Sequence, residues 1–329
     1  HSSMTARQAA SVLLVVSLLL VIVASRRVAS RLSSPKASAV AGLGAVYASI
    51  RAQADESALS WPLASKVLSK CVYRADGAVV PPEFTDGNGP IGAYAMLTTA
   101  ANLELLRWCR AAFERFIADV KSDLSSDEQL RFFENHLCMV EERSWHTCVT
   151  VFHEHPSLLS EGERGHWRAV DATMLRQLAA AVRESTSGIA APRLVLDSLS
   201  ICSDGAMIAG LRDDDDGSFA ALRAASAASA ATTLGGELTS RPKALIHVTL
   251  GRMLGLPPSL TEGQRTRVAH HLRRWNQFLF PKLVKALAPE QLELRVATLS
   301  LARDSVWWMT EYEIHDTWEL SDPELSHQP

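Results

Sequence analysis

Residues 244–252 read ALIHVTLGR, and residues 144–152 read SWHTCVTVF. In an extended chain alternate side chains share a face, so His247 and Thr249 point to one side while the apolar residues between them point to the other. The earlier segment repeats this arrangement, with His146, Cys148 and Thr150 on one face. Two strands of this kind would bring two imidazoles into a single cleft.

The pair of segments resembles the hallmark of the two-histidine (2H) phosphoesterase superfamily. That hallmark is a His-hydrophobic-Thr/Ser-hydrophobic motif that occurs twice, about a hundred residues apart. The segment from His247 to Leu250 matches the pattern fully. The segment that begins at His146 departs from it, since Thr147 occupies the usual hydrophobic position and Cys148 the Thr/Ser position.

The order of the elements expected around the two segments supports the resemblance. Hydrophobic periodicity and turn residues predict strands at 92–98, 193–201 and 206–211, helices at 103–120, 165–183, 218–234 and 262–287 (broken near Pro281), and a closing hairpin of 292–301 with 306–320. This order is close to an internal duplication of His strand, helix and hairpin. The resemblance implies an α+β fold with two pseudo-symmetric lobes of antiparallel strands, outer helices and a central cleft.

Composition sets wider limits on the function. The chain has 329 residues, 47% of them hydrophobic, and a formal net charge of −3, which is typical of a globular protein. A polynucleotide partner would therefore need a local basic cleft. The five cysteines form no Cys-x-x-Cys pair, so neither a zinc site nor a disulfide scaffold is indicated. Motifs for a Gly-rich nucleotide loop, a serine hydrolase elbow or a zinc hydrolase helix are absent from the sequence.

The N-terminus differs from the rest of the chain. Residues 9–25 are uncharged and rich in Leu and Val, and as a helix they would span roughly 25 Å, slightly less than a hydrocarbon core. Arg26, Arg27 and Arg31 follow this run and Arg7 precedes it, which favours a single-pass anchor with the body of the protein in the cytosol. Cleavage of a secretory signal near residues 24–25 and an organelle transit sequence are the alternatives.

These features predict four segments and a set of partners. The segments are a hydrophobic anchor or signal with its linker (1–38), an Ala-rich helical and loop extension (39–91), the 2H-like domain (92–320) and a tail (321–329). The expected partners are a nucleotide or RNA-end substrate and a membrane through residues 9–25. The sequence gives no sign of an obligate protein partner.

The resemblance implies acid–base chemistry without a metal or other cofactor. His146 and His247 would be the general base and general acid, in an order that the sequence does not settle. Thr249 would bind phosphate; Cys148 takes the equivalent position as a weaker donor, and Thr150 would replace it if the strand bulges. The substrate would be a cyclic nucleotide phosphate or a 2′,5′- or 3′,5′-linked RNA end. The alternatives are a protein that binds such a ligand without turnover and a membrane-anchored scaffold.

Several other side chains are weaker candidates. One indole of Trp307 and Trp308 would face inward and the other would stack a base, a role for which Tyr312 is a second candidate. His153 and His155 are two residues apart, so they would hold a metal only on a strand, and the following proline favours a solvated loop. Arg252 lies on the face opposite His247 unless the chain bulges or turns at Gly251.

Overall fold

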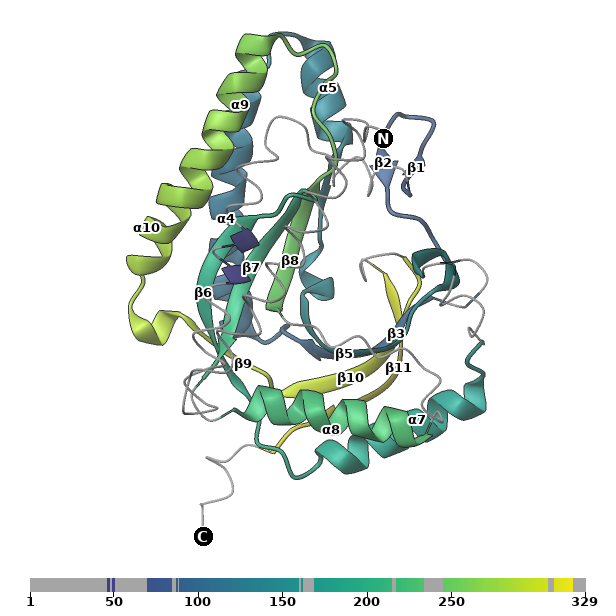
Figure 1. The fold of residues 1–329 in the computed structure, drawn as a ribbon. Helices are drawn as coiled ribbons and strands as arrows, with labels where there is room; N and C mark the ends of the chain where they lie inside the picture. The colour runs from purple at the N-terminus through teal and green to yellow at the C-terminus, as the bar shows by residue number, and fades with distance from the viewer. Residues whose placement is uncertain are drawn as a thin grey trace, which may run out of the picture. The chain divides into compact units, whose positions relative to one another are not determined.

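The computed structural model describes residues 46–47, 49–50, 70–84, 87, 89–159, 161, 169–214, 217–233, 245–306 and 311–321. All of them belong to one compact unit, Gly44–Pro329. This unit is a mixed α+β structure in which the strands of each sheet pair antiparallel, as the sequence predicts (Figure 1).

Two sheets form the centre of the described part. The first has the order β11–β10–β3–β5, with bounds Tyr312–Glu319, Thr298–Asp304, Ile91–Met96 and His146–His153. The second has the order β4–β8–β7–β6–β9, with bounds Leu137–Met139, Ile246–Met253, Ala206–Asp213, Arg193–Ile201 and Glu293–Arg295. A separate small pair consists of β1 (Val72–Tyr73) and β2 (Val79–Val80).

The chain passes between the two sheets more than once. The hairpin β6–β7 follows β5 in sequence but pairs with β8, and the hairpin β10–β11 follows β8 but joins the sheet of β5. The expected strand at 292–301 is divided between the sheets: β9 pairs with β6 in the second sheet, and after two intervening residues β10 begins in the first sheet. Because both pieces alternate apolar and polar residues, periodicity alone does not reveal the break.

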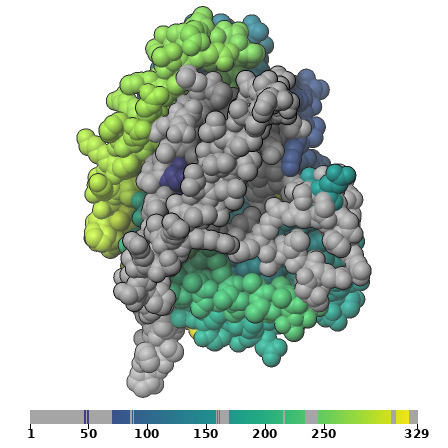
Figure 2. Space-filling model, viewed as in Figure 1, coloured from purple at the N-terminus to yellow at the C-terminus, as the bar shows by residue number. Residues whose placement is uncertain are grey.

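Helices cover the outer faces of the sheets. Figure 1 shows α4, α9 and α10 beside β6–β8, and α7 and α8 below the first sheet; Figure 2 shows α8, α9 and α10 at the surface. The α-helices are α4 (Ala100–Ser122), α5 (Asp127–Asn135), α7 (Ala172–Thr186), α8 (Ser218–Thr233), α9 (Glu262–Arg274) and α10 (Phe280–Lys285). Short 3₁₀ turns lie at Glu142–Ser144, Pro156–Leu158 and Pro289–Gln291.

Local sequence explains how the long helices begin and continue. The Thr99 side chain accepts the Asn102 amide hydrogen at the start of α4, and Thr261 and Gln264 form a capping box at the start of α9. The expected break near Pro281 is replaced by a continuous helical run, because a π-helical turn (Trp275–Leu279) joins α9 to α10 and the proline lies in the first turn of α10. A proline there lacks an amide hydrogen that the first turn does not need.

Tyr47, from the expected extension at 39–91, is part of the core. Its side chain is fully buried, and its hydroxyl accepts the Leu211 amide hydrogen (3.1 Å). The same hydroxyl lies within hydrogen-bond distance of the Leu211 (2.9 Å) and Ile246 carbonyl oxygens, to one of which it donates. Burial raises the pKa of this phenol well above its ordinary value. Tyr47 therefore bonds to β7 and β8 just where their pairing ends at Leu211 and Ile246.

The described residues between 70 and 91 are also attached to the body of the protein. The Phe84 amide donates to the Ser305 carbonyl (2.8 Å), and Glu83 forms an isolated bridge with Val306. Strand β3 begins at Ile91, so the boundary expected at residue 92 falls inside a strand.

The hydrophobic segment at 9–25, the linker and residues 322–329 lie outside the described residues, so the anchor, its cleavage and the localisation stay predictions. Within the described residues, no helix combines the length and apolar character needed to cross a bilayer.

The contact of Tyr47 with β7 leads to a stability prediction. A Cβ atom on Gly210 would lie 2.7 Å from a ring carbon of Tyr47 and 2.6 Å from Ser198 Oγ. We expect Gly210→Ala to lower the free energy of unfolding by about 1–3 kcal/mol through overpacking, measured by denaturant unfolding. Gly188→Ala is the control, because a Cβ there meets no atom within 4 Å. Equal stability of the two variants would contradict the packing of Tyr47 on this strand.

Candidate functional site

Strands β5 and β8 belong to different sheets but contact each other. Arg223 of α8 joins them, because its Nη2 donates to the Cys148 carbonyl (3.0 Å) and to the Leu245 carbonyl (2.6 Å). Cys148 lies two residues after His146, and Leu245 lies two residues before His247. Burial lowers the pKa of Arg223, but a guanidinium keeps its proton, so the junction carries a positive charge.

The face of β8 that carries His247 has the predicted alternation. His247 and Thr249 are partly exposed, whereas Ile246, Val248 and Leu250 are buried. His247 pairs with Gly210 and Thr249 with Ile208 on β7, and these partners pair in turn with Ser198 and Ser200 on β6. The hydroxyls of Ser198 and Ser200 are buried on this face and have no hydrogen-bond partner within the described part of the chain.

A bulge places Arg252 on the same face of β8. The register shifts at Leu250, so that Gly251 pairs with Met207 and Arg252 with Ala206. A Cβ on Gly251 would meet the Met139 sulfur at 2.7 Å, which shows that this position faces the core. The sequence leaves two faces of the strand open for Arg252, and the structure has the one in which a bulge turns the side chain to the His247 face.

The positive charge of Arg252 is balanced by a nearby carboxylate. Its Nη1 lies 2.7 Å from Asp204 Oδ2, and its side chain is 14% exposed. Burial acts to raise the pKa of the Asp204 carboxyl, but the charge and hydrogen bond of Arg252, together with hydrogen bonds from backbone amides, outweigh it and hold that pKa below its usual value. This ion pair makes Arg252 a structural cation in the present arrangement.

The other candidate imidazole is held in a defined orientation. His146 Nδ1 lies 2.8 Å from the Ser144 carbonyl oxygen, and since a carbonyl only accepts, Nδ1 carries the proton. The ring packs edge-on against Tyr94, with centroids 5.1 Å apart. Burial lowers the pKa of His146 to about 4, although the Ser144 carbonyl opposes this effect. At neutral pH His146 is therefore a neutral imidazole with its lone pair on Nε2.

Cys148 lies beside two tyrosines on the His146 face. It packs with Tyr312 against the buried cluster of Tyr94, Met96 and Ala302. The Tyr312 hydroxyl donates to the Arg143 carbonyl (2.7 Å), and the Tyr94 hydroxyl donates to Asp304 Oδ1 (3.3 Å). Burial raises the pKa of Tyr94 well above its ordinary value, so this hydroxyl keeps its proton. Of the proposed stacking residues, Tyr312 thus joins the face of His146 and Cys148.

Thr147 and Thr150 of β5 face the other way. Thr147 is fully buried, and its hydroxyl has no partner among the described residues. A register shift at Val149 pairs Thr150 with Ala93, whereas Cys148 pairs with Tyr94, the next residue along β3. Adjacent residues of β3 face opposite sides, so Thr150 lies buried on the face away from Cys148.

The other site candidates lie elsewhere. Trp307 and Trp308 are outside the described residues. His153 is buried at the end of β5, where burial, Arg303 and His155 lower its pKa to about 4. His155 caps a 3₁₀ turn, because its Nδ1 accepts the Ser157 amide hydrogen (3.2 Å). Within the described ranges no group of three His, Cys, Asp or Glu side chains is placed to hold a metal ion.

Sequence reasoning missed three residues of this region. Tyr94 shares a face with Met96 in the predicted strand at 92–98, but nothing local indicates that this strand pairs with β5. Arg223 lies in an Ala-rich helix whose apolar pattern gives no sign of a contact with two strands. No sequence pattern indicates the contacts of Tyr47, because its partners lie more than a hundred residues away.

Two histidines of β5 with lowered pKa values predict a pH dependence of stability. His146 and His153 have pKa values of about 4 in the folded protein, below the ordinary histidine value of 6.5. The unfolded chain therefore binds more protons in this window, so the stability present above pH 6.5 is lost as the pH falls toward 4. We expect each group to add at most about 1.4 kcal/mol per pH unit to the slope of the free energy of unfolding.

Denaturant unfolding of His146→Gln between about pH 4.5 and 7.5 should give a shallower slope than the unsubstituted protein. His270→Gln, an exposed change on α9, should leave the slope unaltered. An identical slope in all three proteins would mean that His146 titrates normally.

No protein-family model matches the chain, and a search of the curated proteins finds no match. Among solved structures, the chain is similar to the crystal structure of TT0787 of Thermus thermophilus. The identity is 14%, the TM-score is 0.40, and the alignment covers 71% of this chain and 99% of that one. A likeness at this level carries no argument about the function of the present chain.

Proposed function

We propose that this protein is a 2H-type phosphodiester hydrolase that acts without a metal on a cyclic nucleotide phosphate or a 2′,5′- or 3′,5′-linked RNA end. The observation that carries the proposal is the junction of the two motif strands. Arg223 bonds to the backbones of β5 and β8, two residues from each histidine. Each strand also presents its histidine on a partly exposed face.

The topology supports the proposed two-lobed architecture. Each His strand is followed by a helix and then by a hairpin that lies in the sheet of the other His strand. We infer that the two halves are pseudo-symmetric lobes, with the cleft between the faces of His146 and His247.

The proposed mechanism uses the two imidazoles in different protonation states. His146 Nε2, whose lone pair is available when Nδ1–H bonds to Ser144, takes a proton from water as the water oxygen attacks phosphorus. The bond from phosphorus to the leaving ribose oxygen breaks, and protonated His247 gives that oxygen its proton. The Thr249 hydroxyl, on the His247 face, donates a hydrogen bond to a phosphate oxygen, worth about 1.5–3 kcal/mol because the acceptor is charged.

The low pKa of His146 fits the base and not the acid. A group with a pKa of about 4 is almost entirely neutral at about pH 7, so it is ready to accept a proton and has none to give. A bound phosphate anion raises that pKa, because a nearby negative charge stabilises the imidazolium. The order of acid and base, open at the level of sequence, is proposed on this ground.

A second candidate function is binding of the same ligands without turnover. It is favoured by the thiol of Cys148, which stands where the motif has a hydroxyl and packs beside Tyr94 and Tyr312. A thiol is a weak donor, so the first strand offers the phosphate less stabilisation than the second. The two candidates differ in turnover alone.

The catalytic prediction is tested with single substitutions of the full chain. His146→Ala and His247→Ala should each lower the rate on 2′,3′-cyclic nucleotides or 2′,5′-linked oligonucleotides by about 10²–10⁴, the usual contribution of a positioned acid or base. EDTA should have little effect. His270→Ala is the control, since its side chain is exposed on α9.

Three outcomes would count against this assignment. Undiminished rates in both variants would remove the histidines from the mechanism. Loss of activity on chelation, restored by zinc or manganese, would indicate a metal enzyme instead. Ligand binding by the unsubstituted protein with no product would support the second candidate function.

The thiol at Cys148 gives a separate prediction. Cys148→Thr places a hydroxyl at nearly constant volume on the His146 face and should raise kcat/KM severalfold, since about 1.4 kcal/mol of transition-state stabilisation corresponds to a factor of ten. Cys148→Val has a similar size without a donor and should not improve kcat/KM. A Thr variant with a lower Tm and unimproved kcat/KM would show that Cys148 is a packing residue only.

A further inference from the structure

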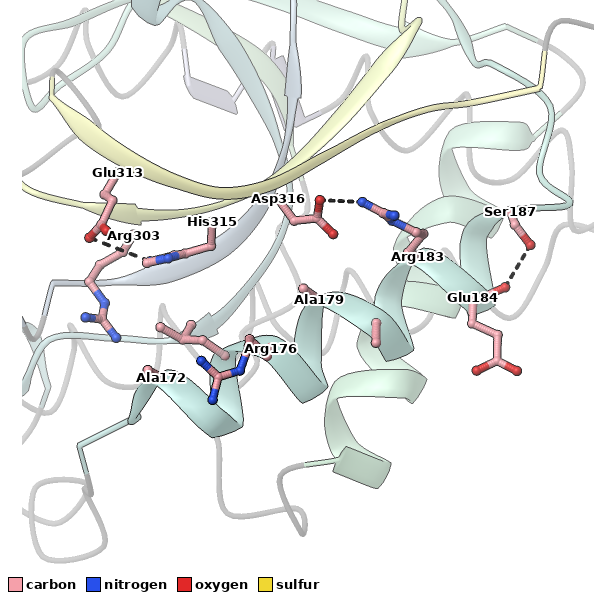
Figure 3. Close-up of a pocket in the computed structure, with 12 residues that line it drawn as sticks. Ala172, Arg176, Ala179, Arg183, Glu184, Ser187, Arg303, Glu313, His315 and Asp316 are labelled. Atoms are coloured by element: carbon pink, nitrogen blue, oxygen red, sulfur yellow. Dashed lines mark hydrogen bonds and ion pairs between the residues drawn. The ribbon is translucent and has the colours of Figure 1, made fainter.

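A cavity of about 740 Å³ lies between α7 and the strands β10 and β11. Its lining includes Arg303, whose partner across β3 is Ile91, and this row faces away from Tyr94 and His146. The cavity is therefore on the opposite side of the first sheet from the candidate catalytic face. Figure 3 shows Arg303 and His315 reaching from the strands toward α7, and Arg176 lying along that helix; all three line the cavity.

The positive charges of the arginines in this groove are not equally balanced by ion pairs. Arg183 forms an ion pair with Asp316. Arg176 donates to Thr173 Oγ1 (3.2 Å), and Arg303 donates to the Val170 carbonyl (2.9 Å). In the part of the chain that the structure describes, neither Arg176 nor Arg303 has a carboxylate within ion-pair distance. Among the described residues, the hydrogen-bond partners of these two arginines are therefore neutral, and the carboxylate of Glu313 lies opposite Arg303 on β11 beyond ion-pair distance.

Two buried nitrogens at the same end of the groove also lack partners. Arg303 Nε and His315 Nε2 have no hydrogen bond within the described residues. The carboxylate nearest to the imidazole, that of Glu313, is 3.9 Å from Nε2, which is too far for a hydrogen bond. Buried polar groups in folded proteins are normally bonded. An anionic ligand supplies an acceptor oxygen for Arg303 Nε, and for His315 Nε2 when that nitrogen carries a proton.

We propose that the groove binds a small organic anion, whose carboxylate or phosphate group lies between Arg176 and Arg303. A guanidinium presents a planar fork of donors that matches both kinds of oxyanion. The apolar part of the ligand would lie against Leu175 and Ala179 of α7, which line the same cavity.

The acidic side chains that line the groove favour a small ligand over a long polyanion. Glu184, Glu313 and Asp316 line the cavity along with the arginines. Together they repel a long polyanion such as an RNA strand, whereas a ligand with a single anionic group at the Arg176 and Arg303 end meets mainly Glu313, the cross-strand neighbour of Arg303. The volume lies within the range of about 300–1,000 Å³ that is usual for small-molecule sites.

The test measures binding of three probes to the full chain at matched ionic strength: inorganic phosphate, acetate and butyrate, with chloride as reference. Tm and the NMR signals of the His315 ring, assigned with His315→Gln, are the readouts. An anion beside Arg303 offsets the charge that, together with burial, lowers the pKa of His315, so bound anion should raise that pKa. Butyrate should bind more tightly than acetate, because its chain reaches the apolar wall; a phosphate preference would identify phosphate esters instead of organic acids.

Substitutions locate the site. Arg176→Gln, an exposed change, should weaken binding about tenfold or more, because charge-assisted hydrogen bonds are lost. Arg273→Gln removes an exposed arginine from α9 and should have no effect. His247→Ala should also leave the His315 response intact, which separates this groove from the proposed hydrolase site.

Two results would overturn the proposal. The first is the absence of a saturable change in Tm or in the His315 signals with every probe. The second is an anion effect that survives Arg176→Gln but disappears in His247→Ala, because the anion would then bind at the catalytic face. Failure of the hydrolase assay alone would leave the groove unaffected.

Discussion

The carbonyl oxygens of Cys148 and Leu245 share one donor nitrogen, Nη2 of Arg223, and the rest of the described structure depends on that junction. Strand β5 is the edge of its sheet, so the outward carbonyl of Cys148 has no strand to pair with. A carbonyl oxygen that is partly shielded from water destabilises the fold unless it accepts a hydrogen bond. A charged donor satisfies it and, with its second hydrogen, fixes where β8 begins. One side chain thus ties together strands from two sheets.

The chain passes between the two sheets more than once, so the junction at Arg223 depends on the assembly of both sheets. Because β6–β7 completes the sheet of β8 and β10–β11 completes the sheet of β5, neither sheet assembles from one continuous stretch of sequence. The Val140 amide bonds to the Leu250 carbonyl (3.1 Å) just before the chain leaves the second sheet and becomes β5 in the first. The two His strands are therefore positioned by long-range pairing and not by their own local sequence.

This dependence explains what the sequence predicts and what it does not. The alternation of β8 is local, since apolar and polar residues take turns, and the strand has the expected buried and exposed positions. The bulges at Val149 and Leu250 are set by the partner strands, so Thr150 turns away from Cys148 and Arg252 turns toward the His247 face, against strict alternation. The bond of Tyr47 to β7 and β8 joins distant segments, and no periodicity signals such a contact.

The two motif strands are unequal, and the inequality is confined to β5. Thr147 buries a hydroxyl without a partner in the described structure, a cost of about 1–3 kcal/mol that a hydrophobic residue at this position would avoid. On the other face, Cys148 replaces a good donor with a weak one, and the nearby Tyr94 hydroxyl is already committed to Asp304. Of the side chains considered on this strand, the proposed mechanism therefore uses His146 alone, through Nε2. In the proposed mechanism β5 therefore contributes the base, while phosphate binding and proton donation both fall to Thr249 and His247 on β8.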